Sequence, residues 1–178
     1  TPRVLLLCGS LQQRSSNGAA LAVARRRLLE GGAEVDEFQQ LAAVEPFNIE
    51  HDDSPPPEAL EWRARAATAD AAVLAGPEYA GALAGSMKNA LDWLVGAAGL
   101  YDKPVALISS GTTGGTLALA DLTRTLTWQG TKIVGQLGIA APRTKTNDDG
   151  VFTDAPTITA IEQLVDALLA AIPSEAPR

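Results

Sequence analysis

The chain has 178 residues, is 46% hydrophobic and carries a formal net charge of −7. That length and apolar content fit a single packed domain spanning residues 1–178. The negative charge argues against nucleic acid and anionic membrane surfaces as main partners, because both are bound through basic faces. Since the sequence shows no pattern of a secretory signal or a membrane span, we expect a cytoplasmic protein.

Short apolar runs alternate with longer segments of helical spacing along the chain. Four runs predict strands at residues 4–8, 71–75, 105–108 and 133–141, and residues 34–38 are a weaker fifth candidate. Such alternation is typical of β-α units around a parallel sheet that is buried on both faces. For five strands and five helices, the expected fold is a flavodoxin-like α/β sandwich with strand order 2-1-3-4-5 and helices on both faces.

Apolar stripes at helical spacing support three of the predicted helices. The stripes are Leu21, Ala24 and Leu28; Met87, Ala90, Leu91, Leu94 and Val95; and Ile158, Ile161, Val165, Leu168 and Ile172. Three successive arginines at residues 25–27 point around the first helix, which indicates a solvated side rather than a binding patch. Residues 45–57 and 143–150 are expected to be irregular, and the tail from Pro173 to be loose.

A polar segment, GSLQQRSSN, follows the first predicted strand, where ligands bind in this fold. A helix N-terminus has unpaired N–H groups and a partial positive charge, so it binds phosphate readily. Capping the helix needs one polar side chain, and five within eight positions favour a phosphate site; capping alone stays open. Neither a GxGxxG dinucleotide loop nor a Walker A loop is present. The candidate side chains are Ser10, Gln12, Ser15, Ser16 and Asn17, with Arg14 as a nearby charge.

A second candidate segment, GPEYAGALAGSMKNALDWL, follows the third predicted strand. Only 4% of the chain is aromatic, so Tyr79 in a predicted loop calls for a reason. Its ring either borders a planar ligand or packs on its own loop, and both interpretations stay open. A third loop, SSGTTGG at residues 109–115, is either the far wall of the same crevice or an ordinary connection.

Together, these motifs resemble the NADPH-dependent FMN reductase family, flavodoxin-like enzymes that include quinone, azo-dye and chromate reductases. The family's PEY, a glycine and a KNALDW run match at residues 77–79 and 88–93. The resemblance implies non-covalently bound FMN, NAD(P)H as co-substrate and a small quinone-like electron acceptor, with no catalytic side chain and no metal. It implies phosphate binding by Ser10, Gln12, Ser15, Ser16 and Asn17, and flavin contacts by Pro77, Glu78, Tyr79, Ser110, Gly111 and Gly114.

The resemblance carries three further expectations. Members are usually homodimers or homotetramers, which makes Trp93 a candidate contact, and residues 45–57 are expected to shape the acceptor site. The family usually has an arginine where this chain has Gln12. Losing that charge-assisted bond is expected to weaken FMN binding by roughly 1–3 kcal/mol, with Arg14 as a candidate substitute.

Other functions are less well supported by the sequence. A hydrolase would need His51, the only histidine, as its base, yet His51 lies in the acidic proline-rich segment and no GxSxG motif is present. A non-catalytic flavin module, either an electron carrier or a redox-responsive binding protein, stays open. Cys8, the only cysteine, ends an apolar run, so we expect a buried small side chain rather than a reactive thiol.

Overall fold

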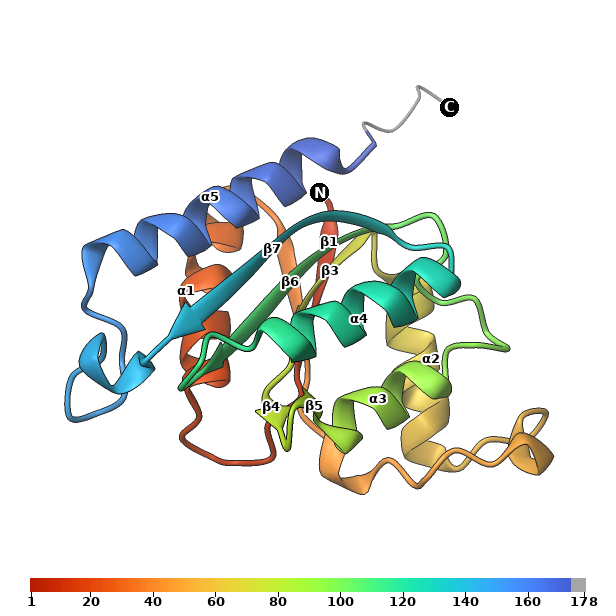
Figure 1. The fold of residues 1–178 in the computed structure, drawn as a ribbon. Helices are drawn as coiled ribbons and strands as arrows, with labels where there is room; N and C mark the ends of the chain where they lie inside the picture. The colour runs from red at the N-terminus through yellow and green to blue at the C-terminus, as the bar shows by residue number, and fades with distance from the viewer. Residues whose placement is uncertain (174–178) are drawn as a thin grey trace.

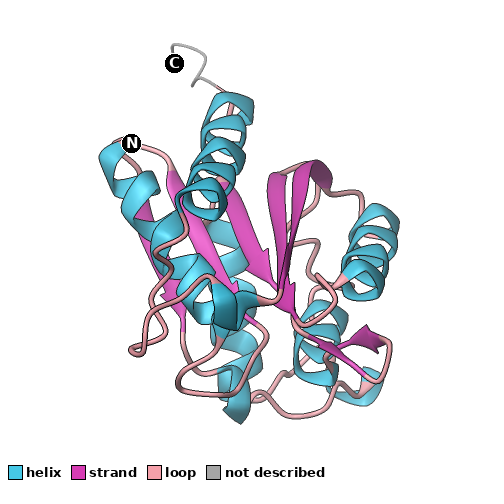
Figure 2. Ribbon diagram, turned by 60° about the vertical axis from the view of Figure 1, so that its left-hand side comes forward, coloured by secondary structure: helices cyan, strands magenta, loops and turns pink. Residues whose placement is uncertain are grey.

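The computed structural model describes residues 1–173 and contains a five-stranded parallel sheet of order β2-β1-β3-β6-β7. This order is the predicted 2-1-3-4-5 arrangement, since β6 and β7 are the fourth and fifth strands of the sheet. The helices that connect successive strands cover both faces of the sheet (Figures 1 and 2). No helix among the described residues has the length and apolar character needed to cross a membrane.

The secondary structure follows the predicted alternation. In chain order the elements are β1 (Arg3–Cys8), α1 (Ser16–Glu30), β2 (Glu34–Phe38), η1 (Leu41–Ala43), η2 (Ile49–His51), α2 (Pro57–Thr68), β3 (Ala71–Ala75), β4 (Glu78–Tyr79), β5 (Ala82–Leu83), α3 (Gly85–Asp92), β6 (Pro104–Gly111), α4 (Thr116–Trp128), β7 (Lys132–Ala140), η3 (Pro142–Thr144) and α5 (Ala155–Ala171). The five predicted strands are confirmed. The predicted loose tail, beyond Pro173 itself, lies outside the described residues.

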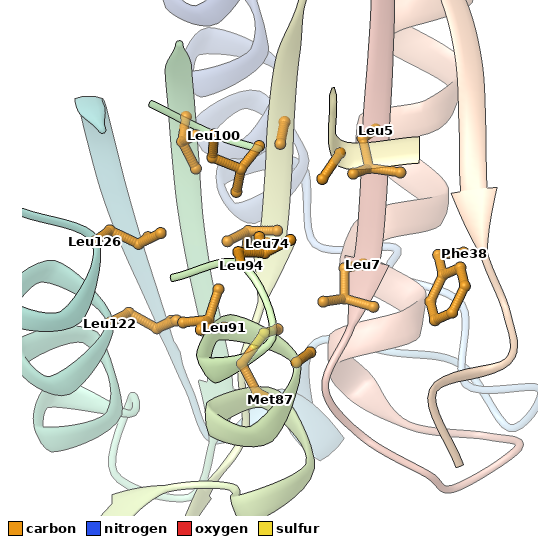
Figure 3. Close-up of a cluster of buried hydrophobic side chains, with 14 of the residues drawn as sticks. Leu5, Leu7, Phe38, Leu74, Met87, Leu91, Leu94, Leu100, Leu122 and Leu126 are labelled. Atoms are coloured by element: carbon orange, nitrogen blue, oxygen red, sulfur yellow. The ribbon is translucent and has the colours of Figure 1, made fainter. Parts of the chain in front are cut away.

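Each face of the sheet has its own apolar layer. Helices α1 and α5 cover one face, and α2, α3 and α4 cover the other. The two apolar layers form because alternate residues of each strand point to opposite faces, and the central strand β3 is buried along its whole length. Figure 3 shows the larger side chains of the second layer: Leu5, Leu7, Phe38, Leu74, Met87, Leu91, Leu94, Leu100, Leu122 and Leu126.

Helix α3 is shorter than predicted, because the apolar stripe that predicted it extends to Val95. Helix α3 ends at Asp92, after which Leu94 is buried in a turn and Val95 is 63% exposed. The carbonyl of Trp93 accepts a 2.6 Å hydrogen bond from Arg63 Nε on α2. The prediction is therefore wrong beyond Asp92: the chain turns there, and Arg63 on α2 binds the carbonyl that the helix end leaves unpaired.

Smaller differences concern the ends of elements. Strand β6 is longer than the predicted 105–108, and β7 ends one residue early because Ala141 adopts a positive φ of 47°. Pro57, predicted in a loop, is the first residue of α2, where its missing N–H costs nothing. The β4–β5 hairpin, which forms a separate two-stranded sheet, was not predicted.

The arginines at residues 25–27 lie on the outer side of α1, as expected, and each forms an ion pair. Arg26 pairs with Glu162 and Arg27 with Asp166, both on α5, at N–O distances of 2.9 and 2.8 Å. Arg27 donates hydrogen bonds to Asp166, and this contact raises the pKa of Arg27 and lowers the pKa of Asp166. These exposed pairs join α1 to α5, and each contributes little to stability because water screens it.

Candidate functional site

Three connections meet at the carboxyl edge of the sheet: residues 9–15 after β1, the β4–β5 hairpin, and residues 112–115 after β6. Gly9 allows the first connection to pack closely on α3 and on the residue before the hairpin, because a Cβ there would lie 2.9 Å from Met87 Cβ and 3.2 Å from Pro77 Cδ. Ser86 Oγ at the start of α3 donates a 2.7 Å hydrogen bond to the carbonyl of Gly9. No motif in the sequence indicated this role of Ser86.

Asn17 fastens the start of α1 to the end of β6. Its side chain is 2% exposed; Nδ2 donates to the carbonyl of Ser110 and Oδ1 accepts from the amide of Ser110, both at 2.9 Å. Ser16 Oγ contacts the same carbonyl at 3.4 Å, and Ser15 caps α1 by accepting from the amide of Gly18 at 2.9 Å. Three of the predicted phosphate ligands therefore use their side chains within the protein.

The backbone at the start of α1 is free to bind an anion. Within residues 1–173, no protein acceptor is hydrogen-bonded to the backbone amides of residues 13–17. Such amides at a helix N-terminus form an anion site, supported by the positive end of the helix dipole. Ser10 Oγ accepts from the amide of Gln12 at 3.3 Å and so shapes the preceding turn. These backbone donors fit a phosphate group, and phosphate binding by the side chains of Ser10, Gln12, Ser15, Ser16 and Asn17 stays a prediction.

Gln12 and Arg14 are both exposed and point to different neighbours. Gln12 lines a hollow of about 790 Å³ between α1 and the end of β2. Arg14 Nη2 donates a 2.8 Å hydrogen bond to the carbonyl of Asp148, in the turn after η3. In this arrangement the Arg14 guanidinium holds the 143–150 segment, which is irregular as predicted.

The β4–β5 hairpin turns through Ala80 and Gly81, whose φ angles are +52° and +74°. Two positive φ values in a two-residue loop define the mirror-image turn that suits hairpins, and Ala80 is strained there because it has a Cβ. Glu78 Oε2 accepts from the amides of Leu117 and Ala118 at the start of α4, at 2.9 and 3.2 Å. The carboxylate of Glu78, a predicted flavin contact, is therefore hydrogen-bonded to the start of α4.

Pro77 and Tyr79 flank Glu78 in different environments. Pro77 is buried, whereas the Tyr79 side chain is 54% exposed on the hairpin. An exposed phenol ring at the sheet edge is available to a planar ligand. This exposure favours the ligand-bordering interpretation over packing on its own loop, and the flavin contact stays a prediction.

The connection after β6 supplies the third side of the site. A Cβ at Gly111 would meet no atom within 4 Å, so the backbone there faces open space, whereas Gly114 has a φ of +85° and packs on Ala140. The buried hydroxyls of Ser109 and Ser110 have no hydrogen-bond partner in the described part of the chain. The Ser109 hydroxyl lies against Gly115, and successive strand residues point to opposite faces, so the two hydroxyls do not face one ligand together. The flavin contacts of Ser110, Gly111 and Gly114 stay predictions.

The KNALDW run holds the chain that follows β2. Asn89 Oδ1 accepts from the amide of Phe47 at 2.7 Å, and Nδ2 donates to the carbonyl of Glu45 at 2.9 Å. Trp93 Nε1 donates to the same carbonyl at 2.7 Å, and its ring packs edge-to-face on Phe47. Trp93 is fully buried, so its prediction as an oligomer contact is wrong. Its indole N–H needed a buried acceptor, and the 45–57 segment supplies one.

Cys8 and His51 lie in different environments. Cys8 is partly exposed rather than buried; its Sγ is 3.8 Å from Ser15 Oγ and lines the hollow beside α1. The α1 N-terminal turn leaves space there that the apolar run did not indicate. His51 is exposed in η2, an environment without the buried partners that a catalytic base requires.

Sequence and structure comparisons identify relatives of the chain. "Probable NADPH:quinone oxidoreductase 1" of Oryza sativa subsp. japonica is 33% identical over 115 residues, 61% of this chain and 58% of that protein. The NAD(P)H:quinone oxidoreductase of Solanum tuberosum is 31% identical over 115 residues, with the same two shares. The chain matches about three fifths of the length of these curated relatives.

A solved structure and a family profile cover more of the chain. The FerB flavoenzyme NAD(P)H:(acceptor) oxidoreductase from Paracoccus denitrificans superposes with a TM-score of 0.80 at 27% identity, covering 97% of each chain. The profile of the family described as NADPH-dependent FMN reductase matches residues 2–146. That match includes the β1–α1 connection, the hairpin and the β6–α4 connection. The chain belongs to the NADPH-dependent FMN reductase family.

Proposed function

We propose that this chain is an FMN-dependent oxidoreductase that takes reducing equivalents from NAD(P)H and passes them to a small quinone-like acceptor. The observation that carries the proposal is the run of unpaired backbone amides at residues 13–17, beside a hairpin and a glycine-rich connection at the same sheet edge. Family membership and the named activities of the rice and potato relatives support it.

In this proposal the phosphate of FMN binds at the start of α1, with the amides of residues 13–17 as donors and Ser10 and Gln12 beside them. The isoalloxazine lies between Tyr79 on the hairpin and the open backbone at Gly111. Bound FMN supplies the chemistry of accepting a hydride from the nicotinamide and returning two electrons to the acceptor. Backbone N–H groups of the hairpin stabilise negative charge at the flavin edge without a proton-transferring side chain.

The segment at residues 45–57 borders the place where an acceptor would enter. Asn89 and Trp93 hold its first part, while Arg63 Nη1 donates to the carbonyl of Asp52 at 2.9 Å. A fixed segment of this kind restricts the shape of a second substrate. We therefore propose that this segment determines which acceptor is used. Rates measured with NADH and with NADPH would show which nucleotide is preferred.

The test uses the purified chain after incubation with FMN. We expect a yellow protein that consumes NADPH steadily when p-benzoquinone is added, with the quinone reduced in equal amount. A yellow protein that does not turn over would favour the alternative, a redox-responsive FMN-binding module. A protein that remains colourless and releases all added FMN on gel filtration would overturn both functions.

We also propose that two copies pair through the face formed by the turns at residues 93–102 after α3 and the second half of α4. Val95, Tyr101 and Trp128 are 63%, 63% and 88% exposed there, and they line a groove of about 590 Å³. Exposed aromatic residues are enriched at protein interfaces. Sedimentation velocity is expected to show a dimer that Trp128→Ser converts to a monomer; a monomeric wild-type protein would contradict this pairing.

A further inference from the structure

Two carboxylates join the β4–β5 hairpin to α4 from opposite directions. Glu78, on the hairpin, accepts from the amides of Leu117 and Ala118 on α4. Asp121, on α4, accepts from the amide of Leu83 on the hairpin at 2.9 Å through Oδ2. Leu83 is only 9% exposed, so its amide depends on a protein acceptor.

The hairpin depends on such contacts because it is small. Each strand has two residues, and a hairpin of that size is not stable in water by itself. Its register pairs Glu78 with Leu83, so the residue that caps α4 and the residue that Asp121 holds lie opposite each other. Leu83 on the hairpin and Leu122 on α4 also both pack against Gly76, where a Cβ would lie 2.7 and 3.0 Å from their side chains.

We propose that Glu78 and Asp121 are positioning residues that join the hairpin and α4 into one unit, and so fix the hairpin against the flavin. Helix α4 begins directly after Gly115, which ends the glycine-rich connection. The two carboxylates therefore set the spacing between the two sides of the flavin site. This inference deepens the proposed function and rests on it, since the hairpin and that connection are the sides assigned to the isoalloxazine.

The geometry distinguishes this role from a direct flavin contact by Glu78. A carboxylate at the N-terminus of α4 is stabilised by the helix dipole and by two backbone donors. A carboxylate facing the flavin would instead repel the negative charge that develops there on reduction. Glu78 therefore acts on the flavin through the position of the hairpin backbone, and its charge is satisfied on α4.

The first test measures the clamp, meaning the hydrogen bonds by which Glu78 and Asp121 join the hairpin to α4, in the protein without FMN. Amide hydrogen exchange, followed residue by residue by NMR, is expected to become at least about tenfold faster at Leu83 in Asp121→Ala and at Leu117 in Glu78→Ala, because each amide loses its acceptor. Arg124→Gln is the matched control: it removes the 2.6 Å pair between Arg124 and Asp121 and leaves the bond to Leu83. Unchanged exchange at both amides in the alanine variants would overturn the proposal.

Two conservative variants separate positioning from charge. Glu78→Gln and Asp121→Asn keep an acceptor oxygen, so their amide exchange is expected to lie nearer to wild type than to the alanine variants. Equal exchange rates in the conservative and alanine variants would contradict the clamp. These variants also serve if an alanine variant does not fold.

The second test measures flavin properties of the same variants. We expect Glu78→Ala to weaken FMN binding about tenfold, while Glu78→Gln keeps the midpoint potential of bound FMN within experimental error of wild type. A potential in Glu78→Gln shifted as far as in Glu78→Ala would assign the carboxylate to the flavin itself and overturn the positioning role. If wild type binds no FMN, the proposed function fails, while the exchange measurements on the free protein still decide the clamp.

Discussion

The β1–α1 connection and the β4–β5 hairpin present backbone groups to the same site in opposite ways. In the first, polar side chains turn into the protein, and Asn17 and Ser15 leave the amides of residues 13–17 free. In the second, carboxylates hold the backbone: the amide of Leu83 donates a hydrogen bond to Asp121. We therefore propose that side chains build the frame of this site and that backbone amides bind the ligand.

This division changes how the resemblance to the family is understood at individual positions. Glu78 and Asn17, both part of the recognised motifs, contact backbone atoms of neighbouring elements. Asn89 in the KNALDW run does the same for the chain at residues 45–47. A motif can therefore identify a cofactor because it preserves the frame around it.

The largest expected effect breaks the frame at Asn17. Asn17→Ala removes both hydrogen bonds to Ser110 and leaves its buried amide and carbonyl without those partners, so we expect a loss of about 3 kcal/mol of unfolding free energy. Urea denaturation of the protein without FMN measures this loss. Ser16→Ala, which removes only a 3.4 Å contact, is the control, and a similar loss in both variants would refute the assigned role of Asn17.

The next effect sharpens the phosphate side of the comparison. Gln12→Arg adds a cation beside the free amides and is expected to tighten FMN binding by about 1–3 kcal/mol, since charge-assisted bonds to phosphate are strong. Isothermal titration of both proteins gives the difference. Equal affinities would mean that Gln12 does not face the phosphate. Arg14→Gln tests the alternative cation and is expected to change FMN affinity little, because Arg14 binds the carbonyl of Asp148.

A smaller effect concerns the strained turn of the hairpin. Ala80→Asn is expected to raise the unfolding free energy by about 0.5–1 kcal/mol, because asparagine adopts a positive φ at lower cost than alanine. Thermal unfolding followed by circular dichroism provides the measurement. The opposite substitution at the neighbouring position, Gly81→Ala, is expected to lower stability; an increase there would show that the turn changes conformation.

The smallest effect lies outside the site and serves as a reference for acid stability. Asp154 accepts hydrogen bonds from Thr157 Oγ1 and from the Thr157 amide. These bonds, the hydroxyl one most strongly, hold the pKa of Asp154 below its ordinary 3.8. A lowered folded-state pKa adds stability above about pH 3.9 that is lost as pH falls through the folded value. The stability difference between wild type and Asp154→Asn should therefore shrink in acid. A difference that stays constant between neutral pH and pH about 2 would contradict this.

The strands of the sheet were predictable from the sequence because most of them are continuous apolar runs. Their order was expected because 2-1-3-4-5 is a common order for five strands that alternate with helices. The end of α3 was not, since the contact between Arg63 and the carbonyl of Trp93 joins residues 30 positions apart in the chain. Asp121 was also missed, because its bond to Leu83 spans 38 residues and depends on the packing of α4. For Ser15 and Asn17, composition indicated polar residues at the right place but not which of their atoms remain free.

The most direct test of the central claim compares FMN with riboflavin, which lacks the phosphate. Titration of the FMN-free protein, followed by flavin fluorescence, is expected to give at least about 100-fold tighter binding of FMN, because several charge-assisted bonds from the amides of residues 13–17 are lost with riboflavin. Equal affinities for the two flavins would contradict the assignment of the α1 N-terminus as the phosphate site.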